Sequence, residues 1–440
     1  MGGVEIGILS VIVIVTLIYA GVYIPVALGL VSFVGVWIIR DNIQMPISLL
    51  SQATSDAISN QVFATIPLFA LMGLLVGQAG LGKDVYDVAN VIFRRIKGGL
   101  GIATVAANAV FAAITGSSIA SASVFTRISV PEMRRFTYTA RFAVGVVAGS
   151  SVLGMLIPPS AMLIIYAIVT EQSVGHMFLA GIVPGIILAI AFIALIVFMA
   201  RFTPNFIGGR VDIAKHGDPE EEPHGIAWMA KKLFPILALV LVVLGGIYGG
   251  VVTAVEAGAA GSAVAIIIAL LRRSLSWKSF WQVLTETGHI TAAILFLIIT
   301  ASMYSRMLGV AALPTLFGEW MQGLDMGFVA VMMLYVVVLI FLGTILDTAS
   351  IILIVVPLFL PIVEGMNMDL VWFGIITVVG AEIGLLTPPL GISCFAIKST
   401  INDPTISLAD IFIGAFPFAV TMLLVLIALI MFPQLSLILI

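Results

Sequence analysis

LGMLIPP at residues 153–159 and IGLLTPP at residues 383–389 decide the fold, because each places a proline pair inside a long apolar segment. Proline removes a backbone donor and clashes with the preceding helical turn, so we expect a helix that breaks at each pair. The two stretches lie 230 residues apart. Working outward, IYAGVYIPVALG at residues 18–29 matches IYGGVVTAVEAG at residues 247–258 at six of twelve positions. The sequence therefore predicts a duplicated chain with one broken helix in each half.

The composition indicates a membrane protein. The 440-residue chain is 61% hydrophobic and 9% charged, whereas about a quarter of the residues in a soluble protein are charged. Apolar runs long enough to cross a bilayer recur along it, which predicts an all-α polytopic membrane protein. The expected spans are residues 5–20, 22–39, 61–81, 137–170, 176–202, 232–250, 252–271, 289–308, 369–400 and 407–438.

Two further apolar stretches, about 99–131 and about 327–362, are interrupted at their centres by residues that favour turns and helix caps. Each arm of about 14 residues would reach about 21 Å as a helix, which is short for a full crossing. We therefore predict two re-entrant helical hairpins whose tips stop near mid-membrane.

Charges beside the hairpins predict their orientation, because Lys and Arg collect on the cytoplasmic side of a membrane. Basic residues flank the first hairpin, namely Arg94, Arg95, Lys97, Arg134 and Arg135. Acidic residues flank the second, namely Glu319, Asp325, Glu364 and Asp369. We therefore expect two inverted-topology repeats, residues 1–210 and 229–440, joined by a cytoplasmic linker at 211–228. The first contains the broken helix 137–170 and the second the broken helix 369–400, and both termini are expected to be periplasmic.

Amphipathic segments and isolated charges give further expectations. Segments 44–58, 83–97 and 275–288 mix charged with apolar residues and are expected along the membrane interface. They could link a static scaffold to a mobile core or serve as ordinary connectors. Glu256 and Glu382 lie in apolar helices and are interpreted as structural, either hydrogen-bonded or protonated. Arg306 and Lys398 lie near span ends and are expected to snorkel towards the membrane surface.

The sequence predicts two cation sites lined by neutral oxygen atoms, one where each hairpin tip meets a helix break. Broken helices free carbonyl oxygens, and irregular backbone at membrane depth must be surrounded by protein or line a cavity. Such oxygens suit Na⁺, whereas no His or Cys cluster for a transition metal is present. Sodium site 1 is predicted at Gly116, Ser117, Ser118, Gly154, Ile157 and Pro159. Sodium site 2 is predicted at Gly343, Thr344, Asp347, Thr348, Gly384, Thr387 and Leu390.

Helix N-termini near the tips carry partial positive charge and free N–H groups, which suits an anionic substrate. The substrate is predicted to contact Ser117, Ser118, Pro158, Thr348 and Pro388. The alternative for any one of these residues is close helix packing, because Gly, Ser and Thr are common where membrane helices meet. Asp347 is interpreted as a cation-site or tip-orienting residue in preference to the alternative, a partner in a buried ion pair.

Other classes of function find little support. The sequence contains no His-Glu-x-x-His, no Gly-x-Ser-x-Gly and no phosphate-binding Gly-x4-Gly-Lys-Ser/Thr motif, so an enzyme is not expected. A channel would show a repeated filter or a ring of charges. A net charge of −3 and no basic block argue against nucleic acid. The single cysteine, Cys394, excludes an intramolecular disulfide.

At the level of motifs the chain resembles the large membrane subunit, the M or DctM-like subunit, of tripartite ATP-independent periplasmic (TRAP) transporters. The resemblance covers essentially the whole chain. It is carried by GSSIASASVFTRISVPEM from Gly116, GMLIPPSAMLIIYA from Gly154, FLAGIVPG from Phe178, GIYGGVVTAVEAGA from Gly246, GTILDTASIILIVVPLFLP from Gly343 and IGLLTPPLG from Ile383.

The resemblance implies an ion-transporter-superfamily-like elevator fold, in which hairpins and broken helices slide against a scaffold. It implies Na⁺-driven uptake of an organic acid anion, delivered by a periplasmic substrate-binding protein, in a bacterial or archaeal inner membrane. A small four-helix membrane subunit is the second expected partner, on a separate polypeptide because this chain starts directly at the M part. No cofactor is expected beyond Na⁺ as the coupling ion. The alternative function is a self-sufficient Na⁺/dicarboxylate symporter that needs no binding protein, and a third class is a scaffold or channel-like membrane protein.

Overall fold

The computed structural model describes all residues except 1, 94, 209–224, 324–326 and 402. Every regular element in that part of the chain is a helix, which confirms the prediction of an all-α protein. The helices of the first half are α1 (Gly3–Tyr19), α2 (Ile24–Arg40), α3 (Gln44–Ser59), η1 (Gln61–Ala64), α4 (Thr65–Gln78), α5 (Leu81–Phe93), α6 (Gly99–Thr115), α7 (Ser118–Arg135), α8 (Ala140–Ser151), α9 (Leu153–Leu156), α10 (Ala161–Val169), α11 (Val174–Phe202) and α12 (Pro204–Ile207).

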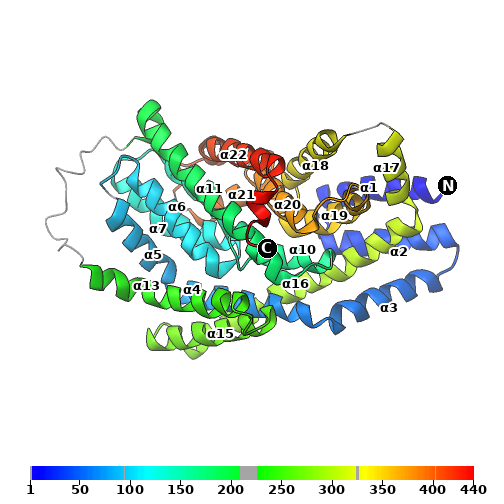
Figure 1. Ribbon diagram of the computed structural model, residues 1–440, viewed down its shortest axis with the longest axis horizontal. Coiled ribbons are helices and arrows are strands. Elements are labelled where there is room, and N and C mark those ends of the chain that lie inside the picture. The colour runs from blue at the N-terminus through cyan, green and yellow to red at the C-terminus, as the bar shows by residue number, and fades with distance from the viewer. Residues whose placement is uncertain (1, 94, 209–224, 324–326, 402) are drawn as a thin grey trace.

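The helices of the second half run from green to red in Figure 1. These are α13 (Ile226–Val240), η2 (Leu241–Gly245), α14 (Gly246–Tyr248), α15 (Ala254–Leu271), α16 (Trp277–Val310), α17 (Leu313–Gly323), α18 (Phe328–Gly343), α19 (Thr348–Gly365), α20 (Leu370–Leu385), α21 (Ile392–Thr400), α22 (Leu408–Met431) and α23 (Gln434–Leu437). Most of the predicted linker 211–228, together with Arg94 and Asp325, lies outside the described residues.

The apolar helices are long enough for a multi-pass membrane protein. Seven helices of the described chain can cross a membrane by length and composition. An eighth span results if Ala140–Leu156 and Ala161–Val169 form one bent crossing, with 43° between its two parts. Many large apolar side chains face outwards, among them Trp37 and Phe234. An outward apolar surface fits a lipid environment, because lipid tails are as apolar as these side chains.

One helix departs from the sequence-based prediction. Segment 275–288 was expected to lie along the interface ahead of a span at 289–308, but both belong to the single helix α16, which has 34 residues. No proline interrupts this stretch. The backbone can therefore continue as one helix from the amphipathic segment into the apolar segment. Helix α17 was not predicted at all, because its eleven residues are too few for the span criterion.

Ion pairs tie the amphipathic helices to their neighbours. The Arg306 guanidinium on α16 donates to Asp56 Oδ2 at 2.5 Å and to Gln52 Oε1 at 3.0 Å, both on α3. These contacts join α16 to α3, and the expectation that Arg306 snorkels towards the membrane surface stays a prediction. Lys398 Nζ donates to the Ile406 carbonyl at 2.6 Å, and its snorkelling likewise stays a prediction.

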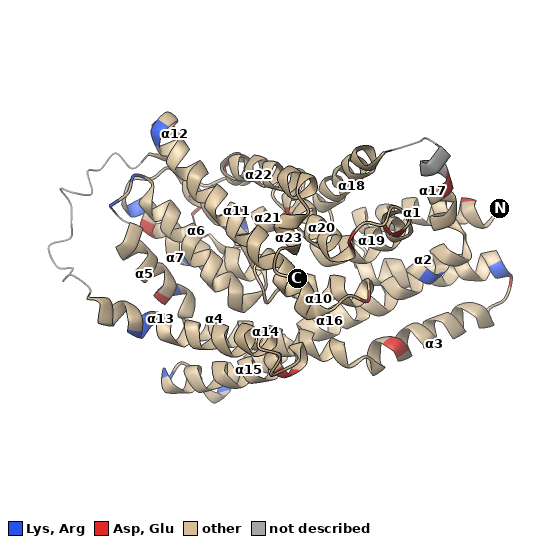
Figure 2. Cartoon of the chain, viewed as in Figure 1, with Lys and Arg blue, Asp and Glu red and all other residues tan. Residues whose placement is uncertain are grey.

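A second charged cluster joins α5 to α13 and α15. Asp84 accepts from Arg272 and lies 3.3 Å from Lys232 Nζ, and Lys232 also pairs with Asp87. Figure 2 shows that charged residues are sparse and that Lys and Arg gather at the end of the molecule near α12 and α13. Asp and Glu are more frequent towards the opposite end, near α3 and α17 (Figure 2).

The centre of the molecule is built from helices of both halves. Helix α8 packs along α22, α18 packs along α20, and α11 contacts α6, α20 and α22. Phe192 of α11 meets Phe418 of α22 edge to face, with ring centroids 5.4 Å apart. Both rings are fully buried. These helices hold the hairpin tips and the helix breaks in place.

Candidate functional site

The first hairpin tip lies against the first helix break. Helix α6 ends at Thr115, α7 begins at Ser118, and Gly116 between them has a φ of +57°. A Cβ atom on Gly116 would come within 2.7 Å of the Pro159 carbonyl oxygen, so only glycine fits this turn. The Gly116 carbonyl accepts from Ala161 N–H at 3.4 Å. The tip and the break therefore touch through their backbones.

The second tip makes the equivalent contact with the second break. A Cβ on Gly343 would lie 2.7 Å from the Ala381 carbonyl and 2.9 Å from Gly384 Cα. The Thr344 carbonyl accepts from the N–H groups of Leu390 and Gly391, both at 3.3 Å. Backbone hydrogen bonds thus link tip and break in both halves, and both proline pairs, Pro158–Pro159 and Pro388–Pro389, contain a cis peptide bond.

Side-chain caps start the helices at the tips. The Ser117 hydroxyl accepts from Ala120 N–H at 3.3 Å, and Ser160 caps α10 after the first break. Asp347 uses both carboxylate oxygens, since Oδ2 accepts from the N–H groups of Ala349 and Ser350, and Oδ1 accepts from the Ser350 hydroxyl at 2.5 Å. Asp347 therefore caps α19 and orients the second tip, which agrees with the tip-orienting role in the favoured interpretation.

A matched pair of buried hydrogen bonds fixes each hairpin to its broken helix. Asn108 of α6 donates to Ser150 of α8 at 2.5 Å, and the hydroxyls of Tyr335 on α18 and Thr377 on α20 lie 2.7 Å apart. The partners in each pair are separated by 42 residues. Sequence reasoning missed all four residues, although the shared spacing of a buried polar pair in both halves was a usable signal.

Glu382 is the unexpected member of the site. Its side chain is 1% exposed on α20 and its Oε1 accepts from the Thr348 hydroxyl at 2.7 Å, which bears out a hydrogen-bonded interpretation. The Ser118 hydroxyl at the first tip lies beside the same carboxyl. Glu382 therefore sits between the two hairpin tips, in contact with residues of both halves. Glu256 is also hydrogen-bonded, through a capping box with Thr253 at the start of α15.

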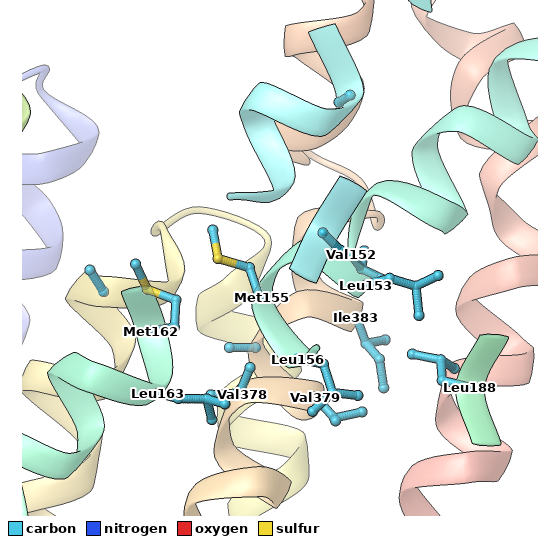
Figure 3. Packing of buried hydrophobic residues seen from close by; sticks show 14 of the residues in the cluster. Val152, Leu153, Met155, Leu156, Met162, Leu163, Leu188, Val378, Val379 and Ile383 are labelled. Carbon is cyan, nitrogen blue, oxygen red and sulfur yellow. The ribbon is translucent and has the colours of Figure 1, made fainter. Parts of the chain in front are cut away.

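The surroundings of the first break are apolar. Figure 3 shows side chains of α9, α10, α11 and α20 converging there, and its labelled residues are Val152, Leu153, Met155, Leu156, Met162, Leu163, Leu188, Val378, Val379 and Ile383. All ten are buried. This close packing shuts water out of the region around the break and raises the cost of any polar atom left without a partner.

The structure brings the predicted site residues together, but it exposes them unequally. Pro158, Pro159, Ser118 and Thr348 are buried, whereas Ser117 is half-buried. Pro388, Pro389 and Leu390 are exposed. Gly154 and Ile157 lie at the first break, where a Cβ on Gly154 would come within 2.9 Å of the Ser117 carbonyl. The Thr387 hydroxyl, just beyond the end of α20, donates back to the carbonyls of Ile383 and Gly384.

A large cavity lies elsewhere in the described part of the chain. It has a volume of about 1140 Å³ and lies between α3, α10, α15, α16 and α19. Its acidic and basic lining residues are Asp56, Glu171, Arg306 and Glu364, and His176 also lines it. No residue predicted for sodium or substrate lines it. In the part of the chain that the structure describes, no three His, Cys, Asp or Glu side chains gather as a metal cluster. The candidate site consists of hydroxyls, backbone carbonyls and the carboxyls of Asp347 and Glu382.

Comparison with known proteins identifies the family. The model of the DctM component of tripartite ATP-independent periplasmic transporters matches residues 11–435. The chain belongs to this family. It is therefore a large permease component of a membrane transporter and not an enzyme. The predicted resemblance to the DctM-like subunit is confirmed.

Several DctM relatives are similar over most of the chain. The C4-dicarboxylate TRAP transporter large permease protein DctM of Pseudomonas aeruginosa is 33% identical over 375 residues, 84% of each chain. The sialic acid TRAP transporter large permease protein SiaM of Vibrio cholerae is 27% identical and covers 96% of each chain. The isethionate TRAP transporter permease protein DctMQ of Oleidesulfovibrio alaskensis is 28% identical, over 91% of this chain and 62% of its own.

Solved structures support the fold alone. The YdaH transporter of Alcanivorax borkumensis superposes with a TM-score of 0.63 and 14% sequence identity, covering 90% of both chains. MtrF of Neisseria gonorrhoeae gives a TM-score of 0.59 with 10% identity, over 90% of this chain and 85% of its own. Both are transporters, and the DctM chain shares their overall arrangement of helices.

Proposed function

We propose that this DctM chain takes up an organic acid anion, a carboxylate or a sulfonate, driven by a Na⁺ gradient. The observation that carries the proposal is the meeting of two interrupted hairpins with two broken helices around buried oxygen atoms. Na⁺ binds to neutral and carboxylate oxygens, and these are the donors present, whereas the described residues hold no cluster of nitrogen or sulfur ligands. The three relatives described above are named for C4-dicarboxylate, sialic acid and isethionate, all organic acid anions.

The ion sites are proposed at the two tips. Ser117 and Ser118 with the carbonyls of Gly116, Gly154, Ile157 and Pro159 would hold one Na⁺. The backbone around Gly343, Thr344, Gly384 and Leu390 with Asp347, Thr348 and Thr387 would hold another. The substrate anion is assigned to the exposed face of this region at Ser117 and Pro388, with Ser118, Pro158 and Thr348 deeper. Helices α7 and α19 both begin there, so their N-terminal partial charges favour an anion.

Alternating access is proposed to occur by an elevator movement. The two hairpins and broken helices would move as one body, since backbone hydrogen bonds join each tip to its break. Helices α2, α4, α15 and α16 pack with one another and would form the scaffold. The two 42-residue hydrogen-bonded pairs support a duplicated core, and the opposite charges at the two ends support inverted repeats with both termini periplasmic.

The partners are proposed from family membership. A periplasmic substrate-binding protein would deliver the anion, and a small membrane subunit would enlarge the scaffold in the inner membrane. Purified protein in proteoliposomes, combined with its binding protein, is expected to accumulate substrate only under an inward Na⁺ gradient. Replacing Na⁺ by K⁺ should abolish accumulation. Equal uptake in K⁺ would refute Na⁺ coupling, and full uptake without any binding protein would establish the self-sufficient symporter instead.

Substitutions of Asp347 can distinguish its role as the N-cap of α19 from its proposed role as a Na⁺ ligand. Asp347→Ala is expected to weaken the Na⁺ dependence of uptake while the protein still assembles, and loss of an N-cap costs about 1 kcal/mol. Asp347→Asn retains a capping oxygen without the charge. If asparagine restores wild-type Na⁺ titration of uptake, the cap alone matters. A Na⁺ titration that alanine leaves unchanged would contradict any role of Asp347 in the ion site.

A further inference from the structure

A small pocket opens where α5, α13 and α15 meet, at the end of the molecule that is rich in Lys and Arg (Figure 2). Its volume is about 480 Å³, which is within the range of pockets that hold small ligands. Its lining comes from the first turns of α5 and α13 and from the residue that follows α15. The lining residues are Asp84, Trp228, Lys231, Lys232, Pro235 and Arg272.

Positive charge exceeds negative charge in this pocket. Lys232 pairs with Asp84, at 3.3 Å, and with Asp87, while Arg272 pairs with Asp84. These two carboxylates balance two cations, and Lys231 is a third cation that has no ion pair with any described residue. The net positive charge therefore attracts an anion.

The ion pairs position Lys232 and Arg272 without using all their donors. A lysine ammonium has three N–H donors and an arginine guanidinium has five. The two side chains are 22% and 27% exposed, so part of each remains accessible from the pocket. The pocket thus holds preorganised donors for an anion with several acceptor oxygens, and a phosphate group is of that kind.

An apolar surface continues from the pocket along α13. Trp228 lies at the pocket, with Lys232 Nζ 4.5 Å from its ring centroid, and tryptophan is enriched where the hydrocarbon of a membrane meets the headgroups. Further along the same helix, Phe234 and Leu237 are 70% and 55% exposed. Among the seven candidate spans of the described chain, Ile226–Tyr248 is the least buried, at 17%. A ligand seated in the pocket therefore has lipid-facing protein surface beside it.

We propose that this pocket binds the phosphate of an anionic phospholipid through Lys231, Lys232 and Arg272, while the acyl chains lie along α13. Basic pockets between membrane helices on the cytoplasmic side suit anionic headgroups, and the cytoplasmic side is where the Lys- and Arg-rich end is expected. A soluble anion would use the basic groups alone and leave the adjoining apolar surface uncovered. The site is separate from the hairpin tips and does not depend on Na⁺ coupling.

The bound lipid has a structural consequence. Helix α5 packs along α6 of the first hairpin and also contacts α13. A phosphate shared by α13 and the end of α15 reinforces the junction that already holds Asp84 of α5. Lipid binding is therefore expected to stabilise the folded chain, because a ligand that binds only the native state raises its stability.

Lipid binding to the purified full chain in a non-ionic detergent tests the site. Phosphatidylglycerol or phosphatidylcholine is titrated in, native mass spectrometry counts the lipid molecules retained per chain, and the melting temperature is recorded. Phosphatidylglycerol is expected to bind at lower concentration than phosphatidylcholine and to raise the melting temperature further. Lys231→Gln is expected to weaken phosphatidylglycerol binding about fivefold, the effect of one basic residue near a membrane surface.

Two controls define the site. Lys278→Gln removes the same charge from an exposed residue of α16 that does not line the pocket, and it should bind phosphatidylglycerol as wild type does. Glycerol phosphate has the phosphate without acyl chains, and it should neither displace phosphatidylglycerol nor raise the melting temperature at the concentrations that saturate the lipid site.

Four results would overturn the proposal. They are equal affinity for the two lipids, wild-type affinity in Lys231→Gln, equal losses in Lys231→Gln and Lys278→Gln, and equal stabilisation by glycerol phosphate. The last result would make the pocket a site for a soluble anion. Lys231 is exposed and makes no ion pair with the described residues, so its replacement leaves the packing of the three helices intact. Because transport is not measured, none of these results bears on Na⁺ coupling.

Discussion

Gly384→Ala is expected to abolish Na⁺-dependent uptake and to destabilise the protein by about 3 kcal/mol, the upper end of the cost of overpacking. A Cβ at this position would lie 2.6 Å from the Gly343 carbonyl carbon and 2.7 Å from the Ile340 carbonyl oxygen. Both atoms belong to the backbone of α18, so no side-chain rotation relieves the clash. The second hairpin would have to move away from its helix break, which would open the predicted ion site.

The control for this variant is Gly288→Ala in α16. No atom lies within 4 Å of a Cβ there, and alanine favours a helix over glycine by roughly 0.5–1 kcal/mol. Melting temperature in detergent and uptake in proteoliposomes are measured for both variants. The control should match or exceed wild type in both. Wild-type uptake by Gly384→Ala would show that the close contact between tip and break is not needed for transport.

Gly145→Ala is expected to separate α8 from α22 and to lower the free energy of unfolding by about 2–3 kcal/mol. The added Cβ would lie 2.6 Å from Gly414 Cα and closer still to the carbonyl of that residue. Gly414 in turn packs on the Arg141 backbone, so the two helices meet through main-chain atoms at both positions. Small residues permit this approach, as in many membrane helix pairs.

The consequence of Gly145→Ala should spread to the first tip, because α8 leads directly to the first break. Thermal unfolding in detergent measures the loss, and Gly309→Ala, where no neighbour lies within 4 Å of the added atom, provides the matched control. The variant should unfold at a lower temperature than this control. Equal melting temperatures would mean that α8 and α22 have room to adjust and that their backbone contact contributes little to stability.

Residue type alone was enough to place most helices of this chain. Proline cannot continue a helix, so α9 ends at Leu156 and α20 ends at Leu385, just ahead of the proline pairs. The long apolar runs predicted a membrane protein, and the motifs pointed to the DctM family. The prediction did not join segments 275–288 and 289–308 into the single helix α16. The two segments differ in the polarity of their side chains, but both can form a continuous helical backbone.

Only some residues of the candidate site could be predicted from the sequence. Ser117 and Asp347 were recognised at the tips because cap residues act within their own turn of chain. Glu382 was set aside as structural, since nothing near it in the sequence reveals its neighbours. Thr348 lies 34 residues away along the chain, and Ser118 belongs to the other half.

By itself, the sequence determined the all-α class, the breaks at the proline pairs and the caps at the hairpin tips, because those properties depend on residues within a few turns of one another. The tertiary structure decided which buried polar atoms meet. It put the carboxyl of α20 between two hairpin tips and left the second proline pair exposed while burying the first. Such contacts arise from the packing of distant helices, and the pattern within any single helix contains no information about its partner.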